Sequence, residues 1–126
     1  MPDTLRVCFF LDVAPARVPD LLAAYDRIRQ EVHAVPGHLR DQLCAPLGED
    51  TTWLLTSEWR DEEAFTAWER SPGHRTLAGP LRSCASAARS LRFTVVRQTP
   101  QGDLTPTGQP APSTQLTQED QWTVTR

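Results

Sequence analysis

The sequence contains no lysine and no asparagine, and its 13 basic residues are all arginines. Without lysine, no internal side-chain amine can form a Schiff base, which excludes that form of covalent catalysis. The formal net charge is −3 and there is no run of basic residues, so the chain lacks the electrostatic signature of a nucleic-acid-binding protein. It also contains no nucleophile elbow, P-loop or dinucleotide-binding fingerprint.

Long apolar segments and a regular cysteine pattern are also missing. No apolar run approaches the roughly 18 residues that a membrane span needs, and residues 1–10 lack the features of a secretory signal. Cys8, Cys44 and Cys84 are an odd number of cysteines at wide spacings, unlike a disulfide framework or a zinc site. We therefore expect a soluble protein of the reducing cytoplasm, without membrane contact.

A change of composition divides the chain near residue 99. The 126 residues predict one domain, and the periodic apolar segments all lie within residues 1–98. Residues 99–126 are rich in proline, threonine and glutamine with little to bury, which predicts a flexible tail. Trp122 could belong to a short strand that docks on a sheet edge, but disorder is the simpler interpretation.

Apolar periodicity predicts the first elements. Residues 5–13 alternate between apolar and other side chains, as in a strand with one apolar face. Residues 18–35 have apolar side chains at helical spacing, with Pro19 suited to the first turn and Pro36-Gly37 to the end. Residues 38–46 and 51–59 follow as a predicted hairpin. The face of the second hairpin strand that we expect to be apolar carries Trp53, Leu55, Ser57 and Trp59.

A second helical segment and a last strand complete the pattern. Phe65 and Trp68 belong to the inward stripe of a helix that begins after an acidic cap. Gly79-Pro80 is expected to interrupt this segment, with helical spacing resuming as far as Ala88. Residues 90–98 alternate again and are predicted as the last strand.

This order, β-α-β-β-α-β, predicts an α+β, ferredoxin-like fold, in which a four-stranded antiparallel sheet has helices on one face. The other face is expected to carry Phe10, Cys8, Leu54 and Thr94 rather than a row of charges. Such a face needs covering, and a second copy of the chain is the simplest cover, so we expect a homodimer.

Four short segments resemble the antibiotic biosynthesis monooxygenase family: VPG at 35–37, SEW at 57–59, DEEAFTAW at 61–68 and SPGH at 71–74. The resemblance covers about residues 5–98. It implies a dimeric α+β barrel, made from the sheets of two ferredoxin-like subunits, with a pocket between sheet and helices in each. Characterised branches include cofactor-independent monooxygenases that form quinones in aromatic polyketide pathways, small quinol- or aldehyde-handling proteins, and haem-degrading enzymes. The quinone-forming branch implies chemistry without a metal or a tightly bound cofactor.

The resemblance also assigns pocket positions. The pocket tryptophan of the quinone-forming branch falls at Trp59, its partner asparagine at Leu55 and a tyrosine at Phe65. Because the chain has no asparagine, that polar partner is absent, and Phe65 keeps the ring of the tyrosine without its hydroxyl.

The haem-degrading branch is matched less well. Its tryptophan falls at Trp68, but its histidine falls near Ala78, one helical turn after His74. Haem degradation is therefore the less favoured activity.

From these positions we expect Trp59 and His74 to be catalytic, Trp59 as a flat wall and N–H donor and His74 as a general base. The predicted substrate-binding residues are Trp53, Leu55, Phe65, Trp68 and Arg82, with Arg82 binding an anion. Plainer roles stay open, since tryptophans are mostly buried in cores, His74 follows a turn, and surface arginines are common.

The other ionisable residues are expected outside the site. His33 suits the negative end of its helix dipole, and His38 is predicted to be solvated at the start of a strand. Asp41 is expected to be a partly buried carboxylate, paired with Arg40 or placed at the dimer seam. Three histidines on three elements have no ligand spacing, so no metal site is predicted.

The predicted function is that of a small monooxygenase oxidising an aromatic polyketide or a related phenolic substrate. Deprotonation would convert the substrate to an electron-rich anion that reduces O₂ directly, while the protein binds the anion and excludes water. Two alternatives stay open: a cyclase or isomerase acting on the same substrates, and a non-catalytic dimeric protein that binds the ligand as an accessory factor.

Overall fold

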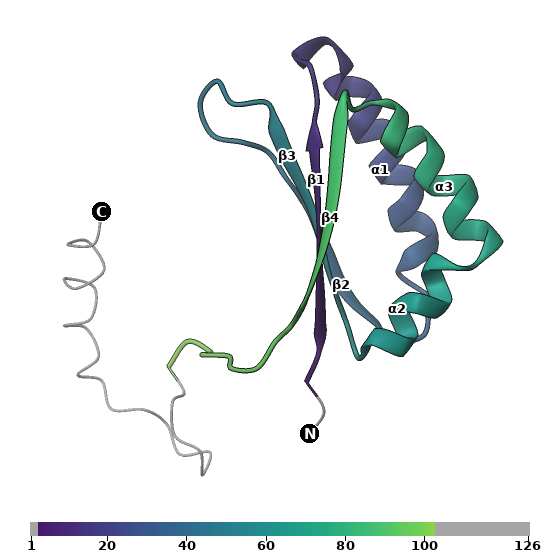
Figure 1. Cartoon of the computed structure of the whole chain (residues 1–126), viewed down its shortest axis with the longest axis vertical. Helices are drawn as coiled ribbons and strands as arrows, with labels where there is room; N and C mark the ends of the chain where they lie inside the picture. The colour runs from purple at the N-terminus through teal and green to yellow at the C-terminus, as the bar shows by residue number, and fades with distance from the viewer. Residues whose placement is uncertain (1–2, 103–126) are drawn as a thin grey trace. The chain divides into compact units, whose positions relative to one another are not determined.

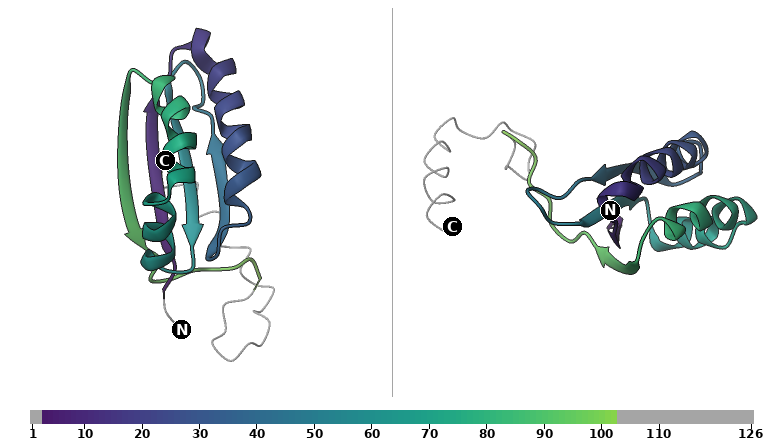
Figure 2. Two further views of the ribbon diagram at one scale, coloured as in Figure 1. Left: turned by 90° about the vertical axis from the view of Figure 1, so that its right-hand side faces the viewer. Right: turned by 90° about the horizontal axis from the view of Figure 1, so that it is seen from above.

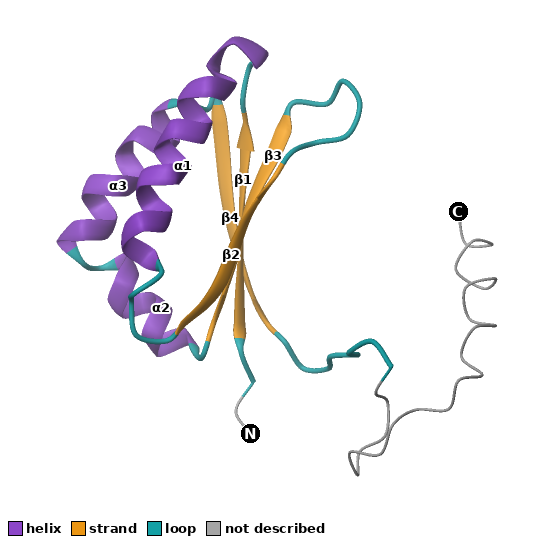
Figure 3. Cartoon of the chain, turned by 180° about the vertical axis from the view of Figure 1, so that it is seen from behind, coloured by secondary structure: helices purple, strands orange, loops and turns teal. Residues whose placement is uncertain are grey.

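The computed structural model describes residues 3–102 (Figure 1). Most of the predicted tail, including Trp122, lies outside the described residues. Residues up to Val96 belong to one compact unit, in which a single sheet has helices on one face only (Figures 1 and 3). The elements are β1 (Leu5–Asp12), a short 3-10 helix (Pro15–Arg17), α1 (Val18–Val32), β2 (His38–Cys44), β3 (Thr52–Trp59), α2 (Glu62–Glu69), α3 (Pro72–Ser83) and β4 (Ala87–Thr94).

The sheet has the strand order β2-β3-β1-β4, and every neighbouring pair is antiparallel. This topology is ferredoxin-like, which confirms the predicted fold class. The helices α1 and α3 run side by side over the sheet (Figure 2). No helix within residues 3–102 is long and apolar enough to cross a membrane.

Local sequence explains where the helices begin. In α1, Pro19 occupies the first turn, where a missing backbone N–H leaves no helical bond unmade. Before α2, the Asp61 carboxylate accepts the N–H of Ala64 at 2.8 Å and so caps the helix. The buried side chains of α1 are Leu21, Ala24, Tyr25 and Val32.

The crossover from β3 to β4 differs from the prediction because it contains two helices. Ser71 caps α3 by accepting the N–H of His74 at 3.2 Å, so His74 belongs to a helix rather than to a turn. Pro80 lies inside α3. It is exposed, so water can reach the carbonyl that loses its N–H partner. The predicted interruption at Gly79-Pro80 is therefore wrong.

The last strand begins earlier than predicted. The sequence predicts a strand over 90–98 with Ala88 still at helical spacing, whereas Ala88 is the β4 partner of Leu11. The N–H of Ser86 donates to the carbonyl of Asp12 at 2.9 Å and so fixes where the crossover meets β1. Pairing with β1 overrides the local periodicity.

The strand registers define the uncovered face of the sheet. Phe10 lies opposite Leu54 on this face, and Cys8 follows the same alternation. Thr94 pairs with Leu5, which is buried under the helices. The predicted placement of Phe10, Cys8 and Leu54 is confirmed, and that of Thr94 is wrong.

The uncovered face also carries charge, which the sequence analysis did not predict. Glu58 is only 3% exposed, because it binds both Arg6, at 3.3 Å, and Arg40. At the β4 edge Phe93 and Leu91 remain 49% and 36% exposed. The face therefore combines a compact ion cluster with exposed apolar side chains.

The core lies between the sheet and the helices in two clusters. The first cluster consists of Leu5, Val7, Val32, Trp59, Ala64 and Phe65. The second cluster consists of Leu11, Val13, Leu21, Ala24, Leu81 and Cys84. Ile28 of α1 packs against both clusters, so α1 joins the two halves of the core.

Gly37 determines how closely α2 approaches the β2 end of the sheet. Its φ is +89°, in the left-handed region that favours glycine. Its carbonyl accepts the N–H of Arg60 at 2.8 Å, and a Cβ at this position would overlap the Cβ of Ala64. Both the backbone angle and the close contact require glycine here.

We therefore predict that Gly37→Ala lowers the free energy of unfolding by about 3 kcal/mol, because it adds left-handed strain and overpacking together. Gly48→Ala is the matched control. Gly48 has a φ of +70° but nothing within 4 Å of an added Cβ, so only the strain of about 1 kcal/mol should appear. Urea unfolding of the three proteins measures the difference, and equal losses for the two variants would contradict the packing argument.

Candidate functional site

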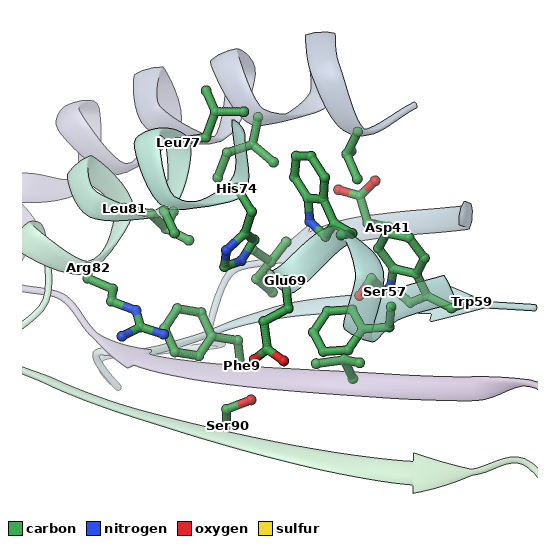
Figure 4. A pocket seen from close by; sticks show the side chains of 17 residues that line it. Phe9, Asp41, Ser57, Trp59, Glu69, His74, Leu77, Leu81, Arg82 and Ser90 are labelled. Carbon is green, nitrogen blue, oxygen red and sulfur yellow. Dashed lines mark hydrogen bonds between the residues drawn. The ribbon is translucent and has the colours of Figure 1, made fainter. Parts of the chain in front are cut away.

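A cavity of about 130 Å³ lies between the sheet and the helices, where the two core clusters meet (Figure 4). Its walls come from β1 and β3, with one residue each from β2 and β4, on one side and from the three α-helices on the other. The lining is mostly apolar, as is typical of small-molecule sites. The polar exceptions are Asp41, Ser57, Glu69, His74, Arg82 and Ser90.

The structure brings together most of the residues that the sequence analysis assigned to the site. Leu55, Trp59, Phe65, Trp68, His74 and Arg82 all line the cavity. Trp53 does not line it: this side chain is partly buried and packs against the second core cluster, where it is the β3 partner of Leu11. The predicted face of β3 is correct, but the cavity occupies only the part of that face from Leu55 to Trp59.

Trp59 is a wall of the cavity whose N–H is already used. Its Nε1 donates to the Ser57 hydroxyl at 2.9 Å. Its ring meets Phe65 edge-on, with the centroids 5.4 Å apart. The predicted role of Trp59 as an N–H donor to substrate conflicts with this bond, because the indole has a single N–H and the Ser57 hydroxyl already accepts it.

His74 and Trp68 form a second aromatic pair on the helix side, with ring centroids 5.4 Å apart and planes at 84°. Burial is the main cause that lowers the pKa of His74 below its ordinary value of 6.5. The Glu69 carboxylate opposes this shift, and Arg82 adds to it. The imidazole is therefore neutral at pH 7 and able to accept a proton.

The cavity opens along β4, in which every residue is exposed. Ser90 and the exposed Arg82 line this end, and the Arg82 guanidinium lies 5.6 Å from the centroid of the Phe9 ring. Glu69 is bound to Arg92 of β4 at 2.6 Å. Among the residues described, Arg82 has no carboxylate partner, so its charge is available to an anion.

The other end of the cavity contains a pair that the sequence analysis did not predict. His38 Nε2 lies 2.9 Å from Asp41 Oδ1, and the two side chains are 7% and 11% exposed. The prediction of a solvated His38 is therefore wrong. Asp41 is also not paired with Arg40, which binds Glu58 on the opposite face of the sheet.

Periodicity could have identified two further cavity residues. Glu69 follows Phe65 by four residues, and helical spacing puts such residues on one face. Ser57 lies between Leu55 and Trp59 on the apolar face of its strand. For His38 no such signal exists, because an irregularity in the β2–β3 register changes which residues face the helices.

Metal ligation has no candidate here. Within residues 3–102, no group of three or more His, Cys, Asp or Glu side chains is arranged to hold a metal ion. The three cysteines are free, with Cys84 buried and Cys8 and Cys44 partly buried.

A ferredoxin-like sheet with helices on one face and an aromatic-walled cavity beneath them defines an α+β class of domain. Within that class the assignment is specific. The family model described as antibiotic biosynthesis monooxygenase matches residues 4–79, more than half of the chain. The chain belongs to the antibiotic biosynthesis monooxygenase family.

Curated relatives come from Streptomyces and from Mycobacterium tuberculosis. The "42.8 kDa protein in whiE locus" of Streptomyces coelicolor is 45% identical over 106 residues, which are 84% of this chain and 26% of that protein. Polyketide synthase CurD of Streptomyces cyaneus is 39% identical over 95 residues, 75% of this chain and 25% of that protein. The chain thus spans about a quarter of the length of these two Streptomyces relatives.

Solved structures share the fold. SnoaB, a cofactor-independent oxygenase from Streptomyces nogalater, superposes with a TM-score of 0.66 and 24% identity, covering 80% of this chain and 100% of SnoaB. MhuD, a heme-degrader from Mycobacterium tuberculosis solved with two hemes in its active site, superposes with a TM-score of 0.64 and 26% identity, covering 76% of this chain and 99% of MhuD.

The lowered pKa of His74 predicts a pH dependence of stability. Because the folded state binds this proton less well than the unfolded state, the chain should lose stability as pH falls below about 6.5, until pH reaches the folded pKa. His74→Gln removes this contribution. The variant should therefore lose less of its melting temperature than the unaltered chain between pH 7.5 and pH 5.5.

His33→Gln is the matched control, because it makes the same substitution at an exposed position at the end of α1, away from the cavity. Thermal melts of the three proteins followed by circular dichroism measure the effect. Parallel curves for His74→Gln and the unaltered chain would show that His74 is not desolvated.

Proposed function

We propose that this chain is a small monooxygenase that binds a planar phenolic substrate, of the aromatic polyketide type, in the cavity and oxidises it with O₂. The single observation that carries the proposal is the combination of aromatic walls with a neutral imidazole, that of His74, in one mostly apolar cavity. Family membership and the polyketide synthase among the relatives support the substrate class.

The size of the cavity supports a flat substrate that is only partly enclosed. A closed apolar cavity of about 150 Å³ holds a benzene ring, so a cavity of about 130 Å³ accommodates one ring of a larger system. Further fused rings would extend past Arg82 and Ser90 at the open end. The edges and faces of Trp59, Phe65 and Trp68 offer such rings the offset and edge-on contacts that aromatic groups prefer.

The first chemical step is a proton transfer. Neutral His74 would accept a proton from an acidic phenol or from a carbon between aromatic rings, which leaves an electron-rich anion. Arg82, whose guanidinium has no carboxylate partner in the described part of the chain, would stabilise this anion. A mostly apolar cavity strengthens both interactions because it keeps bulk water away.

The second step is the reduction of O₂ by the substrate anion. For a substrate with a methylene carbon between two rings, the balance is CH₂ + O₂ → C=O + H₂O. The carbon loses four electrons and two protons, one oxygen atom enters the carbonyl, and the other leaves as water. The substrate itself supplies every electron, so the reaction needs no external reductant.

Haem is the less favoured ligand. The resemblance puts the histidine of the haem-degrading branch near Ala78, whereas the ring of His74 packs edge-on against Trp68.

The three free cysteines favour a reducing, cytoplasmic location for the chain.

We predict that the protein accelerates oxygen uptake by dihydroxyanthrone, a tricyclic phenol with a central methylene carbon, and that one O₂ is consumed for each quinone formed. An oxygen electrode and the absorbance of the quinone measure the two quantities. Since the probe also oxidises slowly in buffer, the rate without protein is subtracted. Oxygen uptake no faster than the rate without protein would exclude the oxygenase, and conversion of the probe to a product other than the quinone under strict anaerobiosis would favour a cyclase or isomerase.

His74→Gln supplies the residue-level control for this experiment. Loss of a general base typically lowers kcat by about 10²-fold or more, and the amide keeps a polar group of similar reach. Binding of the probe without turnover by the unaltered protein would instead identify a non-catalytic ligand-binding protein.

We also propose that two copies pair through the uncovered face of the sheet. This face holds the exposed Phe93 and Leu91 together with Phe10, whose ring lies 5.8 Å from the Arg89 guanidinium carbon. A two-fold axis would bring each apolar patch against its own copy.

Phe10→Asp should therefore weaken the homodimer, because it buries an unpaired charge at the contact. Leu22→Asp is the matched control, since Leu22 is 46% exposed on α1, away from this face. Sedimentation at micromolar concentration should give twice the mass of the chain for the control and a shift toward the monomer for Phe10→Asp. A monomeric unaltered protein would refute the pairing.

A further inference from the structure

The inner end of the cavity contains polar groups that the proposed reaction does not use. Asp41 of β2 and Ser57 of β3 line the cavity, whereas Tyr25 of α1 and His38 of β2 contact Asp41 without lining the cavity themselves. What these groups bind determines how a substrate lies between the two ends.

A β-bulge brings His38 and Asp41 to the same face of the sheet. His38 pairs with Trp59 and Arg40 with Glu58, so Leu39 is one extra residue on β2. Side chains alternate along a strand, and the extra residue therefore turns His38 inward with Asp41 while Leu39 is 46% exposed. Without the bulge, Leu39 would occupy the place of the imidazole.

The imidazole is fixed from two directions. Its ring packs edge-on against Trp59 with centroids 5.1 Å apart and planes at 74°, and Nε2 lies 2.9 Å from Asp41 Oδ1. A carboxylate can only accept, so His38 Nε2 is the donor. Asp41 is thereby held with its carboxylate at the cavity wall, opposite the end where Arg82 lies (Figure 4).

The neighbours of Asp41 leave its carboxylate with acceptor capacity. Tyr25 donates its hydroxyl to the backbone carbonyl of Asp41 at 3.5 Å. Burial is the main cause that raises the pKa of Tyr25 above its ordinary value, and a hydrogen bond to the Asp41 side chain and the charge of that carboxylate add to the shift. This phenol therefore stays protonated as a second donor beside Asp41. Ser57, the β3 partner of Asp41, accepts from Trp59 and keeps its own hydrogen for another acceptor. A carboxylate has about four lone-pair positions, and a buried one is stable only when donors fill them.

We infer that Asp41, positioned by His38, binds a hydroxyl hydrogen of the substrate, a phenol or an enol, at the inner end of the cavity. This inference rests on the proposed function and specifies its substrate. The hydroxyl group of the substrate lies at the inner end of the cavity, and its anionic or carbonyl oxygen lies near Arg82. The reason is that Asp41 accepts hydrogen bonds whereas Arg82 donates them. His38 is a positioning residue, since it acts through Asp41.

The experiment compares two probes that differ only in the donor, β-naphthol and its methyl ether, by isothermal titration calorimetry at pH 7. A hydrogen bond to a carboxylate should make the naphthol bind about tenfold or more tightly than the ether. Asp41→Asn should reduce this preference several-fold, since its amide oxygen is a neutral and weaker acceptor, while Asp26→Asn, an exposed site on α1, should leave it unchanged.

His38 variants test the positioning role. His38→Ala removes the donor to Asp41 and should lower the preference, whereas His38→Gln retains an N–H donor of similar reach and should restore most of it. A purely structural role would instead lower the affinity for both probes equally. If Asp41→Asn does not fold, the inference is still tested by the preference for naphthol over the ether in the unaltered protein, in His38→Ala and in His38→Gln.

Equal affinity of the unaltered protein for naphthol and ether, or a preference that Asp41→Asn leaves undiminished, would overturn the inference. Failure of the proposed function would give different binding and oxygen-uptake results. If neither naphthalene binds, the aromatic cavity itself is refuted together with this inference. A retained hydroxyl preference without oxygen uptake would refute only the oxygenase.

Discussion

The position of one indole ring, that of Trp59, is the constraint on which the site depends. The residue is 1% exposed, and its ring meets Phe65 from α2 and His38 from β2 edge-on, while its N–H is bound by Ser57. Three consecutive elements, β2, β3 and α2, therefore meet on a single side chain. Because protein interiors are close-packed, each of these segments is placed by the same contact. Gly37 permits the arrangement by letting α2 approach the end of the sheet.

The cavity follows from the way the core is divided. One cluster gathers around Trp59 and the other around Leu11, and the space between them is not filled by any side chain. Polar groups occupy its two ends: His74 and Arg82 toward β4, and Asp41, which His38 contacts, toward β2. An apolar interior strengthens electrostatic interactions at both ends, so a ligand in the cavity would be oriented by charge as well as by shape.

Much of this arrangement was predictable where a single periodicity governs an element. The faces of β1 and β3 follow strict alternation, so the inward placement of Leu55 and Trp59 is confirmed. The same holds for Phe65 and Trp68 on α2. The prediction was wrong in α3, because Pro80 is tolerated on an exposed turn. It was wrong at Ala88 because pairing with β1 outweighs helical spacing.

The sequence by itself determined the fold class, the apolar faces of the strands and the segments that identify the family, because these depend on local periodicity and on short contiguous motifs. Only the tertiary structure decided which polar groups meet inside the cavity. A one-residue bulge at Leu39 reverses the side-chain alternation that a sequence pattern assumes. It thereby moves His38 from solvent to a buried position against Trp59 and Asp41. The bond between the Trp59 indole N–H and the Ser57 hydroxyl is likewise seen only in the folded chain. A polar group that is buried from water must find its hydrogen-bond partner within the protein.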